Sequence, residues 1–413
     1  MKLNLDFVRS HFPALAGAWT FMDNAGGSQT LKLVTDRMSR YLLEANVQHG
    51  ASYAVSQKAM AWVREATEAM QALVNAADPQ EIVMGPSATA LFRILSLGMA
   101  RFLKPGDEII VAQTDHEANV SPWTDLEREG FIVKVWNIRS DMQLHLEDLE
   151  RLWTDRTRLL AVTHCSNVLG TIHPVRQWAD WVHSRGGWIC VDGVAYAPHR
   201  RVDVRALDVD FYVFSTYKVY GPHYGLLYGR KEHLLRIPGL NHYFIREDDL
   251  PYKFQPGNVN FELAYSMLGL TDYLRAIAAE HGQPAADIAV TADTAFGLFA
   301  AHEAQLAEKL LSFLNKRDDI QIIGLPTADP TRRVPTISFV QQGRSSEEIV
   351  LAVDSANIGI RFGDFYAKKL IEGLGLEAQQ GVVRVSLVHY NTEEEVDRLI
   401  EVLEPILDQV VPA

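Results

Sequence analysis

The stretch "FSTYKVYGPHYGLLYGR", residues 214–230, places a single lysine between an apolar segment and a Gly-Pro turn. Lys218 follows "DFYVFSTY" (210–217), whose apolar and aromatic residues predict a mostly buried strand. A lysine usually lies at the surface, with its alkyl stem along the protein and its amine in water. An amine at the end of a buried strand therefore raises the question of what it binds.

Seven short apolar segments predict strands, and helical stretches follow most of them. The segments are 81–85, 107–113, 131–138, 157–167, 187–193, 210–217 and 224–230. Strands with few polar residues that alternate with helices indicate a mostly parallel sheet covered on both faces. The sequence therefore predicts an α/β fold.

The pattern changes at about residue 266, where a long helical region leads into short strands and a terminal helix. We expect a smaller α+β domain over 266–413, which includes the linking helix. The large domain is expected to cover 21–265, and the N-terminal segment 1–20 to pack on the small domain.

The composition argues against several classes of function. The 413 residues are 47% hydrophobic and 22% charged, which is typical of a globular protein with a large core. The net charge of -13 argues against binding to nucleic acid or to an anionic membrane surface. No apolar run reaches the ~18 residues of a membrane helix, and the N-terminus lacks the apolar region of a secretory signal.

The two cysteines, Cys165 and Cys190, are too few for a disulfide framework. Their spacing does not match a metal site either. We therefore expect a cytoplasmic protein without a bound metal.

Polar side chains follow the predicted strands at the points where the strands end. They are Ser87, Thr89, His116, Asn167, Asp192, Ser215 and Lys218. In an open parallel sheet, ligands bind beyond the carboxyl ends of the strands. This shared placement favours one binding site, and it is a stronger argument than any single residue.

Asp192 ends the buried segment "WICVDG", and Lys218 follows the next predicted strand. Alone, Asp192 is better explained as a turn residue before glycine, and Lys218 as a loop lysine. At the ends of two adjacent parallel strands, however, the carboxylate and the amine would lie in one crevice. A pyridine cofactor requires this pair, because the amine forms a Schiff base and the acid keeps the pyridinium nitrogen protonated.

His116 and Asn167 each have a structural and a functional explanation. A lone histidine after a strand is more often structural, but its ring can stack on a flat aromatic cofactor. Asn167 is either a turn residue beside Gly170 or a hydrogen-bond partner of a phenolic oxygen on the cofactor ring.

Four hydroxyl groups are candidates for binding a phosphate. Ser87 and Thr89 lie at a strand-to-helix junction, where each residue fits a plain N-cap as well as an anion site. Ser215 and Tyr217 precede Lys218 and offer hydroxyls to the same anion, although Tyr217 fits equally well in the core.

The motifs "TDHEAN", "SNVLGTIHPV", "VDGVAYAPHRRVDV" and "STYKVYGPHYGLLYGR" together resemble the class V aminotransferase family of fold type I pyridoxal-phosphate enzymes. The resemblance is nearest to the cysteine desulfurase/selenocysteine lyase-like branch, and it extends from "FMDNAGGSQ" (21–29) to "RVSLVHYNT" (384–392). It implies a large domain with a mostly parallel seven-stranded sheet between helices, and a smaller C-terminal α+β domain.

The resemblance also implies pyridoxal 5′-phosphate as the cofactor of the large domain. Lys218 would form the internal aldimine, Asp192 would pair with the pyridine nitrogen and His116 would stack on the ring, so these three are the expected catalytic residues. The other expected cofactor contacts are Ser87, Ala88, Thr89, Asn167, Ser215 and Tyr217.

By the same resemblance, Arg384 would bind the substrate carboxylate through its two-pronged guanidinium. Arg361 and Tyr366 are expected beside the substrate. The segment "QPGNVNFE" (255–262) resembles a loop that reaches the cofactor of a partner subunit. Asn258 is therefore an expected cofactor contact, and a homodimer with active sites at the interface is implied.

The sequence departs from the desulfurase pattern at two positions. Tyr366, in "IRFGDFYAKKL" (360–370), stands where desulfurases carry the cysteine that accepts sulfur. Ala195 stands where they usually carry glutamine. Neither Cys165 nor Cys190 easily replaces the loop cysteine, and Cys165 is better explained as a small packing residue.

We therefore expect an enzyme that removes the Cα proton of a cofactor-bound amino acid. Cleavage of a C–S bond by β-elimination, without a persulfide-carrying cysteine, is the favoured reaction. The alternative is a class V aminotransferase or an amino-acid epimerase of the isopenicillin-N-epimerase kind. A non-enzymatic scaffold is disfavoured because both Lys218 and Asp192 are present.

Overall fold

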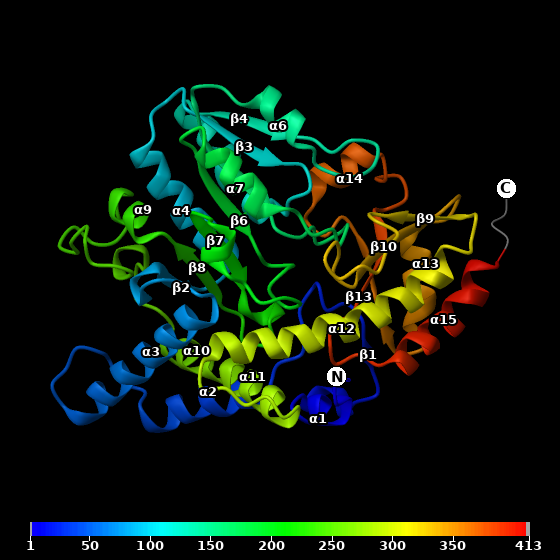
Figure 1. The fold of residues 1–413 in the computed structure, drawn as a ribbon, viewed down its shortest axis with the longest axis horizontal. Helices are drawn as coiled ribbons and strands as arrows, with labels where there is room; N and C mark the ends of the chain where they lie inside the picture. Colours follow the sequence, from blue (N-terminus) through cyan, green and yellow to red (C-terminus); the bar gives the residue numbers. More distant parts are fainter. Residues whose placement is uncertain (1, 410–413) are drawn as a thin grey trace.

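A computed structural model describes residues 2–409, and its centre is a seven-stranded sheet in the order β2-β8-β7-β6-β5-β3-β4 (Figure 1). The strands are β2 (Ile82–Gly85), β3 (Glu108–Ala112), β4 (Ile132–Trp136), β5 (Thr157–Thr163), β6 (Trp188–Asp192), β7 (Phe211–Ser215) and β8 (Gly225–Gly229). In this sheet β8 runs antiparallel to its two neighbours, β2 and β7, and the remaining strand pairs are parallel. The predicted α/β class and the mostly parallel sheet are confirmed.

Both faces of this sheet are covered by helices, and β7 shows how its sequence permits this. Phe211 and Val213 pack on one face with α4 (Ala88–Phe102), α5 (Ser121–Thr124) and α9 (Lys231–Arg236). Tyr212 and Phe214 point to the opposite face, because side chains alternate along a strand. Helices on that face are α3 (Ala54–Leu73), α6 (Leu146–Leu152), α7 (Val175–His183) and α8 (Val204–Leu207).

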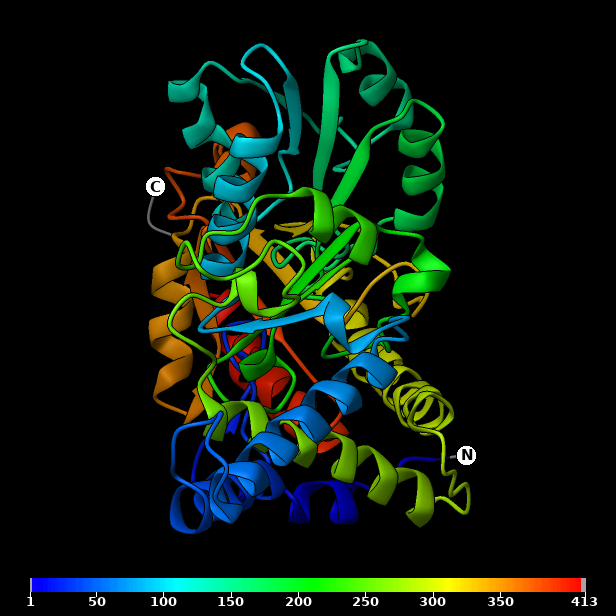
Figure 2. The ribbon, with the colours of Figure 1, turned by 90° about the vertical axis from the view of Figure 1, so that its left-hand side faces the viewer.

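One long helix, α12 (Ile288–Leu314), belongs to two cores. Phe296 and Phe299 in its first half join the core of the large sheet, whereas Leu306 and Leu310 in its second half join the core of the C-terminal domain. Figure 1 shows α12 extending beneath the sheet toward that domain. Before it in sequence, α10 (Phe261–Ser266) and α11 (Leu268–Glu280) pack with α2 (Lys32–Glu44) below the sheet (Figure 2).

The C-terminal domain is built on an antiparallel sheet in the order β12-β13-β10-β9. Its strands are β9 (Ile320–Ile323), β10 (Thr336–Gln341), β12 (Arg361–Gly363) and β13 (Val382–Ser386), and its helices are α13 (Ser346–Asp354), α14 (Lys368–Leu374) and α15 (Glu393–Leu407). Thr392 and Glu395 form a capping box that fixes the start of α15.

The N-terminal segment contacts the C-terminal part of the chain. After α1 (Leu5–Ser10), strand β1 (Thr20–Phe21) pairs in parallel with β11 (Ile358–Gly359). The guanidinium of Arg9 donates to Tyr390 O and pairs with Glu395, both at 2.8 Å. These contacts bring the residues just after β1 next to strand β13.

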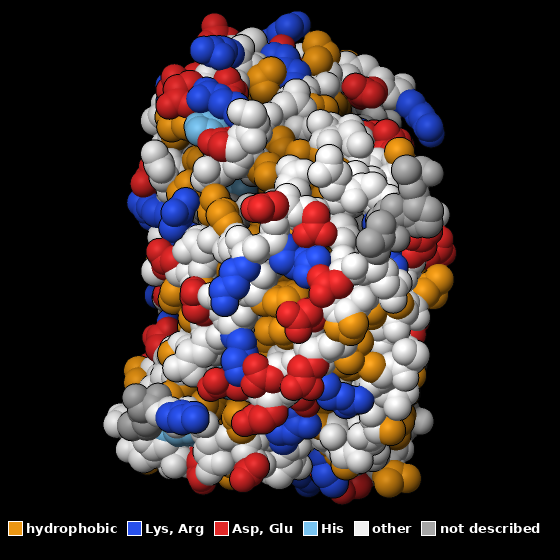
Figure 3. Space-filling model, turned by 90° about the vertical axis from the view of Figure 1, so that its right-hand side faces the viewer, with side chains coloured by type: hydrophobic (Ala, Val, Ile, Leu, Met, Phe, Trp, Pro, Cys, Tyr) orange, Lys and Arg blue, Asp and Glu red, His pale blue; other side chains and the backbone are white. Residues whose placement is uncertain are grey.

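The outer face of the C-terminal domain carries acidic and basic side chains interspersed with each other (Figure 3). No stripe of a single charge sign is visible on this face. None of the helices within residues 2–409 has the length and apolar character needed to span a lipid bilayer.

Candidate active site

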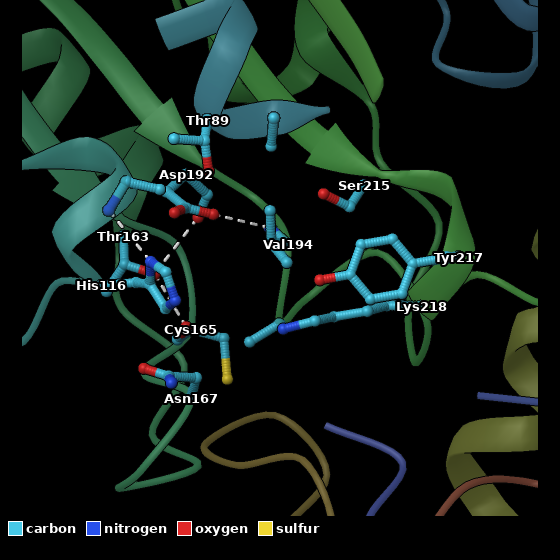
Figure 4. Close-up of a pocket in the computed structure, with 13 residues that line it drawn as sticks. Thr89, His116, Thr163, Cys165, Asn167, Asp192, Val194, Ser215, Tyr217 and Lys218 are labelled. Carbon is cyan, nitrogen blue, oxygen red and sulfur yellow. Dashed lines mark hydrogen bonds between the residues drawn. The ribbon is translucent and has the colours of Figure 1, made fainter. Parts of the chain in front are cut away.

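A pocket lies at the carboxyl ends of β5, β6 and β7, against the first turn of α4 (Figure 4). In the view of Figure 4, Ser215, Tyr217 and Lys218 lie on one side of it, and His116, Thr163 and Asn167 on the other. Its lining consists of Ala88, Thr89, His116, Ala118, Thr163, Cys165, Asn167, Asp192, Val194, Ala195, Ser215, Tyr217 and Lys218.

Asp192 and Lys218 reach the pocket because β6 and β7 are adjacent and parallel. Lys218 lies in a 3-10 turn, Thr216–Lys218, directly after β7 and is 7% exposed. Burial lowers the pKa of the lysine amine to about 8, and the positive charge of Arg384 adds to this effect. A large fraction of this amine is therefore neutral at mildly alkaline pH.

The carboxyl group of Asp192 is buried at the end of β6. It accepts a hydrogen bond from Val194 N at 2.8 Å. Burial nevertheless raises the pKa of Asp192 to about 6. Asp115 is a second buried carboxyl that interacts with it, and burial together with the charge of Asp192 raises the pKa of Asp115 well above its ordinary value.

His116 follows β3 and presents a neutral ring. Its Nδ1 accepts a hydrogen bond from Ala118 N at 2.9 Å, so the ring proton is on Nε2. Burial lowers the pKa of His116 to about 4, with further contributions from the charges of Lys218 and Arg384. A neutral flat ring is suited to stacking on an aromatic ligand.

Close packing defines the end of the pocket formed by α4. Ser87 is the N-cap of this helix, and its hydroxyl accepts a hydrogen bond from Ala90 N at 3.1 Å. A Cβ on Gly225 of β8 would lie 2.7 Å from Ser87 C and 2.8 Å from Ala88 N. The first turn of α4 therefore lies directly on β8, and its N-terminal N–H groups and Thr89 are available to an anion.

Arg384 of β13 is 2% exposed and lies in an adjoining pocket with Lys218 and Arg361. It donates from Nη1 to Asn167 O at 3.2 Å and from Nη2 to Asp23 Oδ1 at 2.7 Å. Within the described residues, its buried Nε finds no hydrogen-bond partner. Burial lowers the pKa of Arg384, while the carboxylate of Asp23 acts in the opposite direction.

Tyr366 lies at the tip of a loop over the same pocket. Phe365 and Tyr366 both have left-handed backbones, with φ of 53° and 59°. Asn167 Nδ2 donates to Phe365 O at 2.9 Å, and the Tyr366 ring lies 5.3 Å from the His116 ring. These contacts hold the loop, while the Tyr366 side chain remains 67% exposed.

A family model for Aminotransferase class-V matches residues 20–399. The chain belongs to the class-V aminotransferase family. It is 42% identical to the aminotransferase-like protein FGM3 of Gibberella zeae, over 98% of this chain and 99% of that protein. It is 35% identical to the cysteine desulfurase-like protein ustD of Aspergillus flavus, over 98% of this chain and 91% of that protein. The solved cysteine desulfurase CsdA of Escherichia coli has a TM-score of 0.84 and 26% identity, with 100% of both chains covered.

Enzymes of the class-V aminotransferase family depend on pyridoxal phosphate, and this is the cofactor of the chain. The residues present fit it. An amine and a carboxyl group face one pocket, the first turn of a fifteen-residue helix borders it, and the buried Nε of Arg384 remains a free donor within the described residues. Lys218, Asp192 and the hydroxyls of Thr89 and Ser215 are the groups that would hold the cofactor.

Most of the predicted site residues come together in these two pockets of the class-V aminotransferase fold. Ser87 and Asn258 do not line either pocket: Ser87 caps α4, and Asn258 lies in an exposed left-handed turn with φ of 71°. Arg361 lines the outer pocket with Tyr366 and Phe365.

Three polar residues of the site were not identified by the sequence analysis. They are Asp23, Asp115 and Thr163. Asp115 lies beside His116 in the quoted "TDHEAN", and Asp23 lies in "FMDNAGGSQ", so the motifs already contain both carboxylates.

The two cysteines are buried and free. Cys165 lines the pocket, and burial raises the pKa of its thiol to about 12, so it stays protonated. It packs with Ala195 and Val334. Ala195 also lines the pocket and presents a methyl group where glutamine would offer a hydrogen bond.

Proposed function

We propose that the chain is a pyridoxal-phosphate-dependent lyase that cleaves the Cβ–S bond of a cysteine-like amino acid by β-elimination, without a protein persulfide. The observation that carries this proposal is the position of Tyr366. It occupies the loop tip over a pocket that contains a buried lysine and a buried arginine, and no thiol is present at that tip.

The chain's own residues suit the first step of such a reaction. When bound, pyridoxal phosphate provides an electron sink for the charge that develops at Cα. Arg384 would hold the substrate carboxylate, and Asp192 would stay next to the pyridine nitrogen. Lys218, whose pKa is lowered to about 8, would accept the Cα proton as its neutral amine.

The remaining steps need no second nucleophile from the protein. Breaking the Cβ–S bond releases the sulfur as a thiolate, and water replaces the amine of the three-carbon product. The overall change for cysteine is cysteine and water to pyruvate, ammonia and hydrogen sulfide. Because Cys165 is buried and its thiol pKa is raised to about 12, it is a poor sulfur acceptor.

Epimerisation or transamination is the second candidate, and it is favoured by the phenol of Tyr366. An epimerase needs an acid on the face of Cα opposite to the base. The Tyr366 ring lies 5.3 Å from the His116 ring, at the border of the pocket that Lys218 also lines. Tyr366 would then return a proton to Cα.

We also propose that the chain forms a homodimer with active sites at the interface. Asn258 lies in an exposed turn of the segment after β8, and the same segment exposes Tyr243 and Phe244, which are 99% and 65% exposed. Exposed aromatic side chains of this size are typical of protein interfaces.

The lyase proposal is tested by incubating the cofactor-loaded enzyme with cysteine, cystine and S-substituted cysteines. We expect pyruvate and a sulfur product from at least one of them. The Lys218→Ala variant should lose the visible absorbance of the lysine-bound cofactor and at least about 100-fold in rate. Lys316→Ala, an exposed lysine after α12, is the matched control and should keep both.

Tyr366→Phe separates the two candidate reactions. Elimination by Lys218 should proceed in this variant at a similar rate, because the phenol takes no part in it. Interconversion of the two enantiomers of the substrate without pyruvate, with loss of this interconversion in Tyr366→Phe, would contradict the lyase and support the epimerase. Exchange of the Cα proton for deuterium in D2O should persist in Tyr366→Phe, because it depends on Lys218.

A further inference from the structure

Arg384, the residue expected to bind the substrate carboxylate, already binds a carboxylate of its own chain. Its Nη2 lies 2.7 Å from Asp23 Oδ1. The side chain of Asp23 is thus a carboxylate, the same group that an amino-acid substrate would present to Arg384. The guanidinium is buried, so this charge-assisted hydrogen bond is only weakly screened by solvent.

The backbone around Asp23 is fixed to the strand that carries Arg384. Asp23 forms a β-bridge with Ser386, Asn24 N donates to Ser386 O at 3.2 Å, and Ala25 N donates to Ser386 Oγ at 2.8 Å. The distance between the two backbones is therefore set, and only the side chain of Asp23 is free to change partner. A Cβ on Gly26 would lie 2.8 Å from Asp23 Oδ2, so the carboxylate of Asp23 packs directly against this glycine.

A second guanidinium lies on the other side of the carboxylate. Arg361 Nη1 is 3.8 Å from Asp23 Oδ2, and the Arg361 side chain is 57% exposed. Arg361 is therefore able to adjust its position in solvent, whereas Arg384 is not. Asp23 lies between one buried arginine and one exposed arginine.

We propose that Asp23 is a specificity-determining residue that occupies Arg384 until a substrate carboxylate takes its place. The displaced Asp23 carboxylate then pairs with Arg361. The proposal rests on the proposed role of Arg384 as the carboxylate-binding residue, and it holds for elimination, epimerisation and transamination alike.

This arrangement makes binding depend on a negative charge in the ligand. A carboxylate offers Arg384 the same bond that Asp23 offers, so the exchange is nearly balanced. A neutral group cannot replace a charged acceptor without a loss, because it leaves a buried guanidinium without its counter-charge. Amino acids would thus be accepted and simple amines rejected at the same position.

The proposal is tested by calorimetric titration of the cofactor-loaded full chain with propionate and with its uncharged analogue propionamide. Neither probe has an amine, so binding is measured without any reaction. In Asp23→Asn, the internal competitor is uncharged, and we expect propionate to bind about tenfold more tightly. Propionamide binding should not change. Asp36→Asn, which removes a surface carboxylate paired with Lys32, is the matched control and should behave like the wild type.

Arg361→Gln tests the second half of the exchange and changes a side chain that is 57% exposed. Propionate should bind more weakly in this variant, because the displaced Asp23 has no second guanidinium. Unchanged or weaker propionate binding in Asp23→Asn overturns the proposal, and so does unchanged or tighter binding in Arg361→Gln.

Arg384→Gln distinguishes this proposal from the proposed function. Propionate should no longer bind to that variant. If propionate binds as strongly as it does to the wild type, Arg384 is not the carboxylate site, and the proposed role of Asp23 is refuted as well. Absence of lyase activity would leave all of these binding results unaffected.

Discussion

Lys218 is a buried amine whose surroundings contain more than one cation. Its pKa is lowered to about 8, mainly by desolvation. The positive charges of Arg384 and Arg361 act in the same direction, and the carboxylates of Asp192 and Asp23 act in the opposite direction. At pH 7 about a tenth of the amine is neutral, compared with less than about a thousandth for a lysine of ordinary pKa. Only the neutral amine can attack an aldehyde or accept a proton from Cα.

The rate at which the cofactor-free protein reacts with pyridoxal phosphate should therefore rise with pH around a midpoint near 8. Arg384→Gln should move this midpoint upward, since it removes a positive charge that disfavours protonated Lys218. The exposed Arg64→Gln should leave it unchanged. Stopped-flow absorbance measures the rate, and a wild-type midpoint near 10.5 would contradict the burial effect.

The same shift has a consequence for stability. The folded chain releases the Lys218 proton near pH 8, whereas the unfolded chain holds it to about 10.4. Between these values the unfolded state binds more protons, so the contribution of Lys218 to the free energy of unfolding rises with pH. Below pH 8 Lys218 is protonated in both the folded and the unfolded chain, so the cost of burying its charge lowers the free energy of unfolding by the full amount.

The position of a site residue was predictable from the sequence when the residue directly follows a predicted strand. It was less predictable when the residue is held by a partner far away in the sequence. Lys218 and Asp192 each follow an apolar strand, so the pattern alone brings them to one edge of the sheet. Asp23 and Arg384 are 361 positions apart, and no local pattern indicates their ion pair. Their contact depends on an isolated β-bridge between Asp23 and Ser386 rather than on a long strand pair.

At the scale of elements, the buried strands were the easiest to predict. All five residues of β7 and of β8 are buried, so their apolar runs are unbroken. The direction of β8 is not encoded in such a run. Its antiparallel pairing with β7 fits the connection 216–224, which is shorter than the dozen or so residues that a parallel crossover requires. Strand β9 was not identified, because its four residues include an exposed Gln321 and two half-buried isoleucines.

The contact between β8 and α4 supports a prediction about cofactor binding. Gly225→Ala would place a Cβ 2.7 Å from Ser87 C and 2.8 Å from Ala88 N, which forces the first turn of α4 outward. We expect a loss of about 1–3 kcal/mol in the free energy of unfolding and weaker binding of pyridoxal phosphate. Urea unfolding and an absorbance titration measure the two effects.

Gly297→Ala is the control for this substitution. Gly297 lies within α12, and nothing lies within 4 Å of the position of its Cβ. Alanine should stabilise the helix by roughly 0.5–1 kcal/mol. Equal cofactor affinity in wild type and Gly225→Ala would show that the N-terminus of α4 takes no part in phosphate binding.

At the scale of the molecule, the site depends on parts of the chain that are far apart in sequence. The large sheet provides Lys218 and Asp192, β13 provides Arg384, and the residues after β1 provide Asp23. Helix α12 joins the two cores as one continuous element. The geometry of the two pockets is therefore fixed by long-range packing, which the sequence pattern indicates only as a succession of elements.

Several exposed apolar side chains lie on one face of the molecule, and this supports a prediction about assembly. Exposed apolar side chains occur on α2, on α3 and its preceding loop, and in the segment after β8, which lie on the face shown in Figure 2. They are Leu42, Leu43, Tyr53, Val55, Met60, Tyr243 and Phe244. The face in Figure 3 carries interspersed charges with hydrophobic side chains between them. A homodimer that forms through this apolar face would remove these exposed apolar side chains from water.

Light scattering after size exclusion should accordingly give twice the chain mass of 46.3 kDa. Leu43→Glu, which places a charge among the exposed apolar residues, should shift the mass toward one chain, since an unpaired charge in an apolar interface is strongly unfavourable. Leu351→Glu on α13 is the matched control, because Leu351 is 58% exposed but belongs to the C-terminal domain. The mass of this variant should equal that of the wild type. A wild-type mass of one chain would exclude the dimer, and a monomer from Leu351→Glu alone would place the interface on the C-terminal domain.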